Sequence, residues 1–371
     1  MELSDRGRGG KERPWGINRY TSQRLAEIYY DIAGFDACNP YFKKASRISN
    51  CGSYLTFVDC DCNRGKKLVD SRFCRVRLCP LCQWRKSLFV FLQFLRVAHE
   101  ALRVNPKNRF LFLTLTERNV TAPFLDDAID RNFKAWHKMT RWVEWESSVC
   151  GSFRSFEVTW NPRRKDFHHH LHAILEVRPS YFGKYYLSQA DYARMWRNAL
   201  GLDYTPVVYV EPVKAKKPNL KTVDDFISHE CLTDDLLAKA AAEVSKYTVK
   251  ISDYLYDDDR KEIILALDAA LKNRRLIDYK GTLKRAYKRL NEVSVDKADL
   301  VSLGECGLLD CPVCNSELTQ VQYRWSKNSC YVMDSYTRYE GVNKVDNESG
   351  FDFDPEFEAF CEEIDSEFPP F

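Results

Sequence analysis

The sequence predicts an α+β fold in which helices pack against an antiparallel sheet. Strand and helix patterns alternate along the chain, and the polar loop NPRRKDF joins two of the strand patterns into an expected β-hairpin. The hydrophobic content of 44% and the aromatic content of 13% are those of a folded chain. With 371 residues, the chain is long enough for one large domain with smaller appended parts.

The expected elements follow from the spacing of apolar side chains. Ser188, followed three residues later by Asp191, predicts the start of one of the helices. Strands are expected over residues 110–116, 155–160, 168–177 and 206–213. Helices are expected over residues 83–103, 125–145, 188–200, 233–250 and 260–273.

Composition divides the chain into six segments. The first is rich in Gly, Arg and Lys near its start and is expected to be a basic N-terminal arm. The expected order is the arm over 1–45, a zinc-binding segment with a helix over 46–104, a core over 105–255, a helical segment over 256–300, a second cysteine cluster over 301–335 and an acidic flexible tail over 336–371.

The formal net charge of +3 is unevenly distributed. Residues 346–371 contain ten acidic residues and no Lys or Arg. Because the other 43 acidic residues and all 56 basic residues lie in residues 1–345, that part carries a formal charge of +13. A basic body with an acidic end suits a polyanionic partner such as a nucleic acid.

Two sequence features indicate a cytoplasmic protein. No apolar run is long enough to span a membrane, and the polar N-terminus lacks the apolar core of a secretory signal. The chain has 14 cysteines, and in a reducing compartment clustered cysteines bind metal more often than they form disulfides.

Four of the seven histidines lie between positions 168 and 172. Side chains on a strand alternate between its two faces, so His168, His170 and His172 are expected on one face and His169 on the other. Successive members would be about 7 Å apart and could share one divalent ion. This face is therefore a candidate metal site.

The expected hairpin would also bring a carboxylate to this face, because its simplest register puts Glu157 opposite His170. Two imidazoles and a carboxylate, with positions left for phosphate oxygens, suit Mg²⁺ or Mn²⁺. The third ligand is either Glu157 or His168, and Glu157 is preferred because a hard oxygen ligand favours these ions over zinc. A solvated polar strand face is the alternative, which the apolar run over 173–177 disfavours.

A second candidate site lies on the helix expected over residues 233–250. Glu243 and Tyr247 are four residues apart, so their side chains share one helical face. A tyrosine hydroxyl can attack a polarised phosphodiester, and a carboxylate one turn away could help to release the intermediate. Lys246 and Lys250 could hold phosphates. Taken alone, the spacing favours a packed core tyrosine, because Tyr247 also lies on the apolar stripe.

The cysteines gather in two clusters. Cys74 and the turn Cys79-Pro-Leu-Cys82 predict a closed four-thiolate zinc site, with ordinary buried thiols as the alternative. Its fourth ligand is Cys51 or Cys62. Nearby basic residues indicate a DNA-facing zinc knuckle; they are Arg75, Arg77, Arg85 and Lys86. The second cluster repeats the C-P-x-C pattern as a second zinc candidate and consists of Cys306, Cys311, Cys314 and Cys330.

Four motifs, which follow one another along the chain in the family's order, resemble those of bacterial plasmid rolling-circle replication initiators. These initiators belong to the HUH endonuclease superfamily. FCRVRLCPLCQWRKS is similar to the family's zinc and basic segment, and FLTLT to its first motif strand. HHHLHAIL is similar to its metal-binding strand, and EVSKYTVK to its catalytic helix. His169 stands where the family usually has proline, and it is expected to face away from the ion.

The resemblance implies an RRM-like palm as the nicking core over residues 105–255. It puts the nucleophile at Tyr247, metal-binding histidines at His170 and His172, and a termination glutamate at Glu243. The implied activity is metal-dependent nicking and joining of a plasmid double-strand origin, through a 5′-phosphotyrosine that leaves a 3′ hydroxyl primer. The alternatives are a single-tyrosine transposase or relaxase of the same superfamily, and a zinc-dependent DNA-binding regulator without chemistry.

The end of the chain alternates acidic and aromatic residues over 351–371 and finishes in Pro-Pro-Phe. A disordered solubilising tail is the usual interpretation of such a segment. The end also resembles the acidic tips by which bacterial single-strand-binding proteins recruit partners. We therefore expect Phe371 and the nearby acids to dock on a host helicase or another replication protein.

Overall fold

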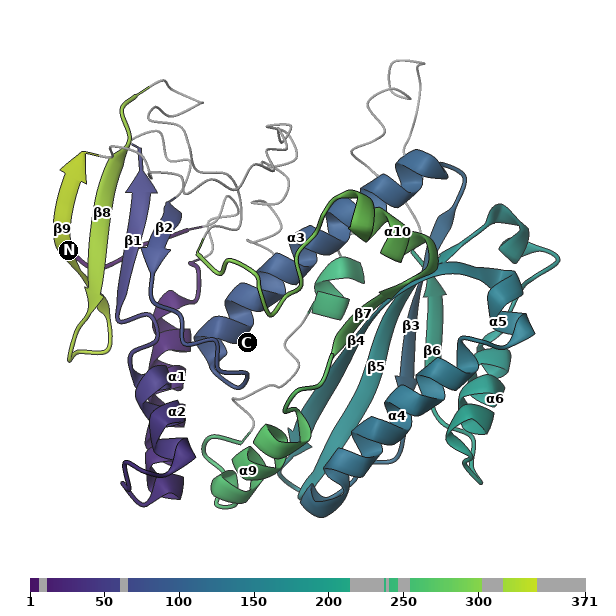
Figure 1. Cartoon of the computed structure of the whole chain (residues 1–371), viewed down its shortest axis with the longest axis horizontal. Coiled ribbons are helices and arrows are strands. Elements are labelled where there is room, and N and C mark those ends of the chain that lie inside the picture. Colours follow the sequence, from purple (N-terminus) through teal and green to yellow (C-terminus); the bar gives the residue numbers. More distant parts are fainter. Residues whose placement is uncertain are drawn as a thin grey trace. The chain divides into compact units, whose positions relative to one another are not determined.

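The computed structural model describes residues 1–6, 12–60, 66–213, 237, 240–245, 254–301 and 316–338, which form two compact units (Figure 1). The first unit comprises Met1–Phe89 and Val295–Phe371, and the second comprises Val90–Ser294. Both contain antiparallel sheets flanked by helices, so the expected mixed architecture is confirmed at this level.

The first unit combines two helices with a four-stranded sheet. The helices are α1 (Trp15–Ala33) and α2 (Pro40–Ser49). The strand order is β2-β1-β8-β9, with every neighbouring pair antiparallel. The strands are β1 (Tyr54–Asp59), β2 (Lys67–Ser71), β8 (Thr319–Trp325) and β9 (Tyr331–Arg338). The β1–β8 pairing joins segments more than 250 residues apart in the chain, so the two ends of the sequence build one sheet.

The N-terminal segment differs from the arm expected over residues 1–45. It holds α1 and the start of α2, because Trp15, Leu25 and Tyr29 supply an apolar stripe that is buried. Asn39 caps α2 by accepting a hydrogen bond from the backbone N–H of Tyr41, with a proline at the first position of the helix. The basic composition near the start of the chain concealed this periodicity.

The second unit contains a five-stranded sheet with the order β6-β3-β5-β4-β7, and every neighbouring pair is antiparallel. Its strands are β3 (Arg109–Thr116), β4 (Val149–Asn161), β5 (Asp166–Val177), β6 (Val208–Pro212) and β7 (Ile277–Lys280). The expected hairpin is confirmed as β4 and β5, and its register pairs Glu157 with His170 as predicted.

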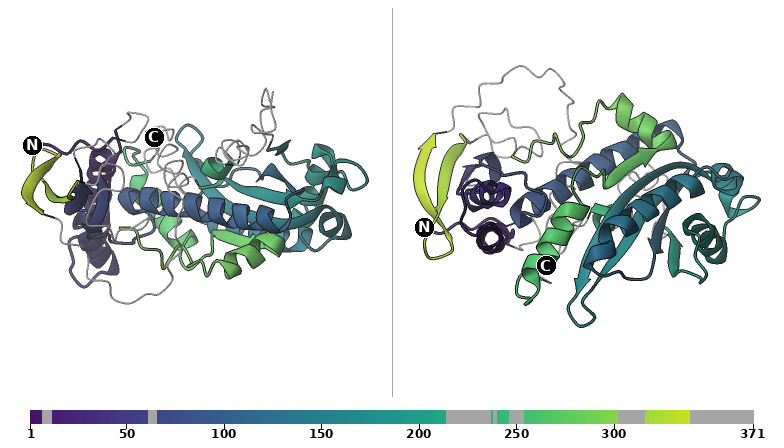
Figure 2. Two further views of the ribbon diagram at one scale, coloured as in Figure 1. Left: turned by 90° about the horizontal axis from the view of Figure 1, so that it is seen from above. Right: turned by 60° about the horizontal axis from the view of Figure 1, so that its bottom comes forward.

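Helices cover both faces of this sheet. Phe133 of α4 (Leu125–Met139) contacts Phe156 of β4, on the face opposite to Phe153. The C-terminal part of α3 (Pro80–Val104) packs on the other face, where Phe94 contacts Phe153 with ring centroids 4.9 Å apart. Further α-helices of this unit are α5 (Val143–Ser148), α6 (Gln189–Leu200), α9 (Arg260–Ala270) and α10 (Gly281–Arg289), and their arrangement can be followed in Figure 2.

Most expected helices are present, and two expectations need correction. Ser188 caps α6, and its side chain and that of Asp191 form a reciprocal capping box as predicted. The single helix expected over 125–145 is interrupted after Met139, because Trp142 adopts an extended backbone before α5 begins. The segment expected to be helical over 256–300 also contains β7, which adds an edge strand beside β4.

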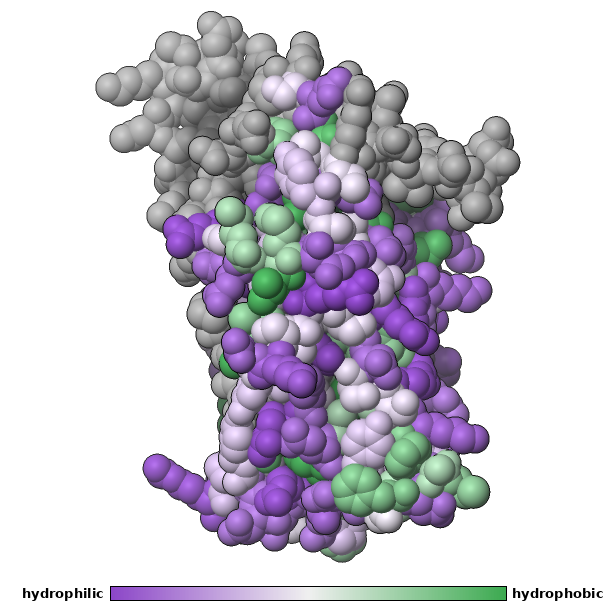
Figure 3. Space-filling model, turned by 90° about the vertical axis from the view of Figure 1, so that its left-hand side faces the viewer, coloured by the Kyte–Doolittle hydropathy of each residue, from purple (hydrophilic) through white to green (hydrophobic). Residues whose placement is uncertain are grey.

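Within the described residues, no helix is long and apolar enough to cross a membrane. On the face drawn in Figure 3, hydrophilic residues predominate and the apolar residues lie in small separate groups. Single exposed apolar residues of this kind are usual on a protein surface.

A buried polar network stabilises the sheet on the face opposite the paired Glu157 and His170. Glu117 accepts hydrogen bonds from Nε of Arg131 at 2.9 Å and from Nδ2 of Asn132 at 2.8 Å. Its Oε2 atom also lies 3.4 Å from Nε2 of His169, whose side chain is fully buried. Burial raises the pKa of Glu117, but the hydrogen bonds and charges of His169 and Arg131 outweigh it, so the pKa lies below its ordinary value.

We expect Glu117→Gln to lower the free energy of unfolding by about 1–3 kcal/mol, because it removes a buried acceptor and leaves its donors partly unpaired. The folded-state pKa of Glu117 is depressed, so its contribution is present above the unfolded-state pKa and is lost as pH falls through the folded-state value. Urea unfolding of the parent chain and of Glu117→Gln, at neutral pH and below pH 4, measures the difference in unfolding free energy at each pH. Exposed Glu144→Gln is the control, and an equal effect from both substitutions would contradict the role of the network.

Candidate metal centres

The first centre lies on the β4–β5 hairpin of the second unit. His170 and His172 are two residues apart on β5, so both side chains point to the same face. The register brings Glu157 of β4 opposite His170, and the residue directly opposite His172 is Ser155. Strand alternation and hairpin register alone therefore bring one carboxylate and two imidazoles together.

Three donor atoms converge in this group. Nε2 of His170 lies 2.9 Å from Nε2 of His172 and 3.1 Å from Oε2 of Glu157, which is 3.4 Å from Nε2 of His172. The side chains are 9–17% exposed, so the centre is largely shielded from solvent. Two imidazole nitrogens and a carboxylate oxygen at these separations form a set of ligands for one divalent cation.

The electrostatics of the group favour an ionised carboxylate. Burial raises the pKa of Glu157, but hydrogen bonds and charges from His170 and His172 lower it more, to about 2. The carboxylate is therefore deprotonated throughout the physiological pH range. This is the state in which it could bind a cation.

Neighbouring residues orient the histidine rings. Nδ1 of His172 lies 3.0 Å from Oγ1 of Thr114 on β3, and its ring stacks on Phe112 with centroids 5.4 Å apart. A hydrogen bond at Nδ1 leaves Nε2 free to bind a metal. The sequence pattern FLTLT contains Thr114, but its contact with His172 could be found only once the β3–β5 register was known.

The structure separates His168 from this group. Nδ1 of His168 lies 3.0 Å from Oδ1 of Asn119, and Nδ2 of Asn119 donates to Oδ1 of Asp166 at 2.7 Å. His168 lies beside His170, with ring centroids 5.0 Å apart, but it has no donor atom in the converging set. Of the two candidates for a third ligand, Glu157 is the one that the structure brings to His170 and His172. His169 lies on the opposite face, as expected.

The predicted tyrosine helix is described only in part. Residues 240–245 are helical, and Glu243 within them is half-buried. Tyr247, Lys246 and Lys250 lie outside the described residues.

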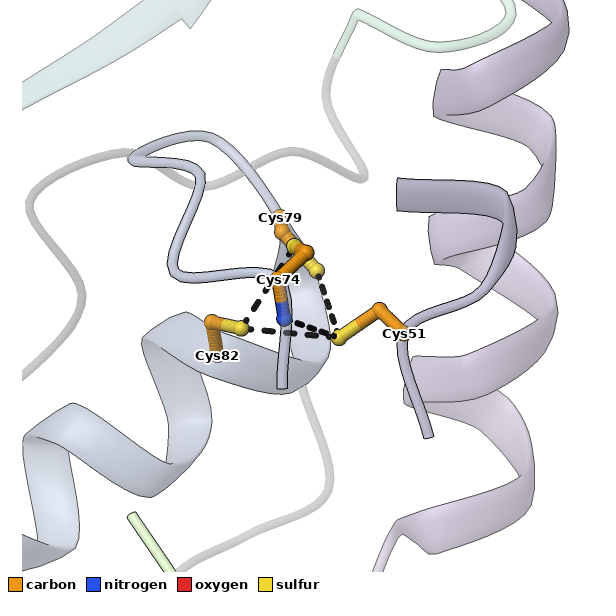
Figure 4. A group of neighbouring side chains, drawn as sticks. All are labelled: Cys51, Cys74, Cys79 and Cys82. Atoms are coloured by element: carbon orange, nitrogen blue, oxygen red, sulfur yellow. Dashed lines mark hydrogen bonds between the residues drawn. The ribbon is translucent and has the colours of Figure 1, made fainter. Parts of the chain in front are cut away.

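The second centre is a group of four buried cysteines in the first unit, shown in Figure 4. Cys51 follows α2, Cys74 and Cys79 lie in the segment between β2 and α3, and Cys82 lies in the first turn of α3. The sulfur of Cys51 is 3.5 Å from that of Cys82 and 3.6 Å from that of Cys79, and Cys74 is 3.6 Å from Cys82. Tetrahedral zinc with 2.3 Å bonds would require sulfur separations of about 3.8 Å.

Backbone donors surround these sulfurs. The N–H of Cys74 points to the sulfur of Cys51 at 3.3 Å, and the N–H of Arg75 to that of Cys82 at 3.2 Å. Arg75 has a positive φ of 56°, which turns its N–H toward the group. Burial raises the pKa of Cys79, but hydrogen bonds from the other three thiols outweigh it and hold the pKa well below its ordinary value. One sulfur of the group is therefore readily ionised.

Of the two candidates for the fourth cysteine, the structure describes one. Cys51 completes the group, and Cys62 lies outside the described residues. Of the second predicted cluster, Cys306, Cys311 and Cys314 also lie outside them, and Cys330 is part-buried with its sulfur 3.2 Å from Oγ of Ser326. Its grouping with the other three stays a prediction.

The basic residues near the cysteines differ in accessibility. Arg75 is exposed, and Arg77 and Lys86 are half-buried, with Nζ of Lys86 3.7 Å from Oδ1 of Asp296. Arg85 is only 6% exposed, lies over the ring of Trp15 and donates to the backbone oxygens of Leu300 and Val301. These contacts occupy its guanidinium, so the DNA contact expected of Arg85 is corrected to a packing role.

Comparison with known proteins identifies relatives of the chain. Residues 65–332 match the family described as "Replication protein". A "Protein rep" of Bacillus amyloliquefaciens is 36% identical over 313 residues, which cover 82% of this chain and 89% of that protein. A "Protein rep" of Lactiplantibacillus plantarum is 36% identical over 82% of this chain and 90% of its own length.

A "Replication protein" of Staphylococcus aureus is 29% identical over 57% of this chain and 86% of its own length. No solved structure matches the chain. The matched region includes Cys74, Cys79 and Cys82 but not Cys51. It also includes the whole β4–β5 hairpin with Glu157, His170 and His172. The chain belongs to the replication protein family, whose members are plasmid replication initiators.

Proposed function

We propose that the chain initiates rolling-circle replication by nicking and rejoining plasmid origin DNA through Tyr247. The observation that carries this proposal is the convergence of Glu157, His170 and His172 on one point. The relatives support the replication role, and the three donor atoms support a metal-dependent nuclease rather than a regulator without chemistry. By its resemblance to HUH endonucleases, the five-stranded sheet would be the palm of such an enzyme.

A divalent cation such as Mg²⁺ or Mn²⁺ fits the donor set, because the carboxylate is ionised and the ring of His172 is fixed by Thr114. When bound, it would supply Lewis-acid polarisation of a phosphate oxygen. The chain's own residues then supply orientation and proton transfer. Thr114 and Phe112 hold the imidazole plane of His172. Glu157, His170 and His172, called the triad below, are little exposed, which limits access of water.

In the proposed reaction, the phenolic oxygen of Tyr247 forms a bond to the scissile phosphorus as its proton is lost. The bond from phosphorus to the 3′ oxygen breaks, and that oxygen takes up a proton to become the primer hydroxyl. The product is a 5′-phosphotyrosine, so the energy of the broken ester is retained for rejoining. Glu243 would accept the proton of the water or hydroxyl that later releases this intermediate.

We expect Tyr247→Phe and His170→Ala each to reduce nicking of a supercoiled plasmid carrying the cloned origin by at least about a thousandfold. The first removes the nucleophile and the second removes a ligand. Gel separation of open and closed circles, with detection of DNA-linked protein, measures both steps.

Tyr209→Phe and His137→Ala are matched controls at exposed positions and should retain full nicking. Continued formation of protein-linked open circles by Tyr247→Phe would reassign the nucleophile. Unaltered nicking by His170→Ala at limiting Mn²⁺ would contradict the proposed binding of the cation by His170.

For the cysteine group, we propose a structural zinc site formed by Cys51, Cys74, Cys79 and Cys82. Four thiolates leave no open position for chemistry, and the group links the end of α2 to the start of α3. The surrounding N–H donors stabilise the negative charge that four sulfurs would bring.

We expect Cys82→Ser to lower bound zinc by about one ion per chain and to lower the thermal unfolding midpoint, because a structural site contributes its binding energy to folding. Elemental analysis of the purified chain and calorimetry measure the two effects. Exposed Cys38→Ser should change neither. Equal zinc content in Cys82→Ser and the parent would show that the group holds no zinc.

The acidic C-terminus lies outside the described residues, and we propose that it recruits a host helicase or another replication protein. We expect deletion of residues 363–371 to reduce plasmid copy number several-fold in cells, because it removes the acidic residues and the terminal phenylalanine that would bind the partner. Nicking in vitro should stay unchanged, because the deleted segment contains none of the metal-binding residues. Replacing the same nine residues with a Gly-Ser segment is the length control. An unchanged copy number after deletion would end the idea.

A further inference from the structure

A basic surface lies on α10 of the second unit. This helix, GTLKRAYKR, contains Lys284, Arg285, Lys288 and Arg289 and no acidic residue. All four basic side chains are exposed, while Leu283 and Ala286 are buried against the sheet. The helix therefore has one packed face and one uniformly cationic face.

The stability of the helix accounts for only part of this charge. Lys284 and Lys288 are four residues apart, as are Arg285 and Arg289, and like charges at this spacing repel each other. Lys284 also lies in the first turn, where the helix dipole disfavours a cation. Lys288 and Arg289 lie in the last turn, where the dipole favours cations, so the dipole accounts for these two charges but not for Lys284 and Arg285.

Most of these cations are not paired within the protein. Among the described residues, Lys284, Arg285 and Lys288 have no ion pair or hydrogen-bond partner from their side chains, and Arg289 lies 3.1 Å from Glu100. Glu100 is already paired with Arg103 at 2.7 Å. The nearby Glu292 is likewise held by Arg96 through two hydrogen bonds. Glu100 and Glu292 are therefore already held by other cations, and the buried Glu176 accepts hydrogen bonds from Thr282 of α10 and from Nδ2 of Asn108.

The positive surface extends to the end of the sheet. Arg178 follows β5. Burial raises the pKa of the Cys150 thiol, and the positive charges of Arg178 and Arg285 oppose that rise, so both arginines lie near the start of β4. Lys280, just before α10, has its pKa lowered to about 8, mainly by burial and then by the charges of Arg154, Arg141 and Lys284, against the opposing charge of Asp278. Arg178 and the four basic residues of α10 are called the α10 surface below.

The α10 surface lies at a fixed distance from the triad along the same sheet. Lys280 pairs with Ser152, and Ser152 pairs with Leu175 of β5. Leu175 is five residues from His170, which corresponds to about 16 Å along the strand. This length spans about five base pairs of duplex DNA at 3.4 Å per step.

We propose that the α10 surface binds the phosphate backbone of duplex origin DNA beside the nick site. The inference rests on the proposed function, because it assigns the duplex flank of the same substrate. A duplex suits the surface better than a single strand, since single strands bind by stacking on exposed aromatic rings. The aromatic residue of α10, Tyr287, is instead half-buried against Tyr279, with ring centroids 5.0 Å apart.

The test replaces Lys284, Arg285 and Lys288 together with Gln in the full chain. We expect affinity for a labelled 30-base-pair origin duplex in 0.1 M salt to fall at least about tenfold, because three phosphate contacts are lost. The slope of log K against log salt should become shallower by about 2.7. Affinity for a 30-nucleotide single strand spanning the nick site, and cleavage of it, should stay within about twofold of the parent.

A control triple carries Gln at Lys134, Lys138 and Arg194, which are exposed on surfaces that also hold acidic residues. It removes the same charge and should leave the salt slope unchanged. The α10 variant should also melt no lower than the parent, because like-charge pairs have been removed.

An unchanged duplex salt slope in the α10 variant would overturn the proposal. An equal loss on duplex and single strand would also overturn it, because the surface would then attract any polyanion. Failure of the parent to cleave the single strand would count against the proposed function alone, since the duplex binding measurement does not depend on cleavage.

Discussion

The pairing of β4 with β5 is the constraint on which the candidate active centre depends. Its register puts Glu157 opposite His170, and the two-residue period of β5 brings His172 to the same face. A slip of one residue would turn both imidazoles toward the face of His169 and into the buried network of Glu117. That network and the packing of Phe133 on Phe156 therefore hold the register that assembles the triad.

In the first unit, the four cysteines have a comparable organising role. Cys51 follows α2, and Cys82 lies in the first turn of α3, so the sulfur group joins a helix pair to the helix that enters the second unit. The Gly52 position shows how closely this turn is packed, because an added Cβ would clash with a methyl carbon of Leu81. Closing such a loop by a metal removes freedom mainly from the unfolded chain.

Sequence periodicity predicted most of the second unit because its contacts are largely local. The β4–β5 hairpin needs only one short turn, and α6 begins at a capping box between Ser188 and Asp191. Pairings across long separations were missed: β7 joins β4, and β8 joins β1, without any local signal of a partner. The choice of Glu157 over His168 also needed tertiary structure, because the contact of His168 with Asn119 depends on a loop after β3. Burial of Arg85 is a further case, since basic character alone cannot tell a solvated guanidinium from one stacked on Trp15.

The charges of the second unit suggest why binding and cutting would use different surfaces. The ionised carboxylate of Glu157 would repel a phosphate before any cation is bound. Attraction of DNA must then come from elsewhere on the unit. Lys284, Arg285 and Lys288 meet this need, because their charges are unpaired among the described residues. They follow Lys280, which lies in a row of the sheet about 16 Å along β5 from His170. At that distance salt screens the cations from the triad substantially, so the positive surface can attract a duplex without lowering the affinity of the triad for its cation.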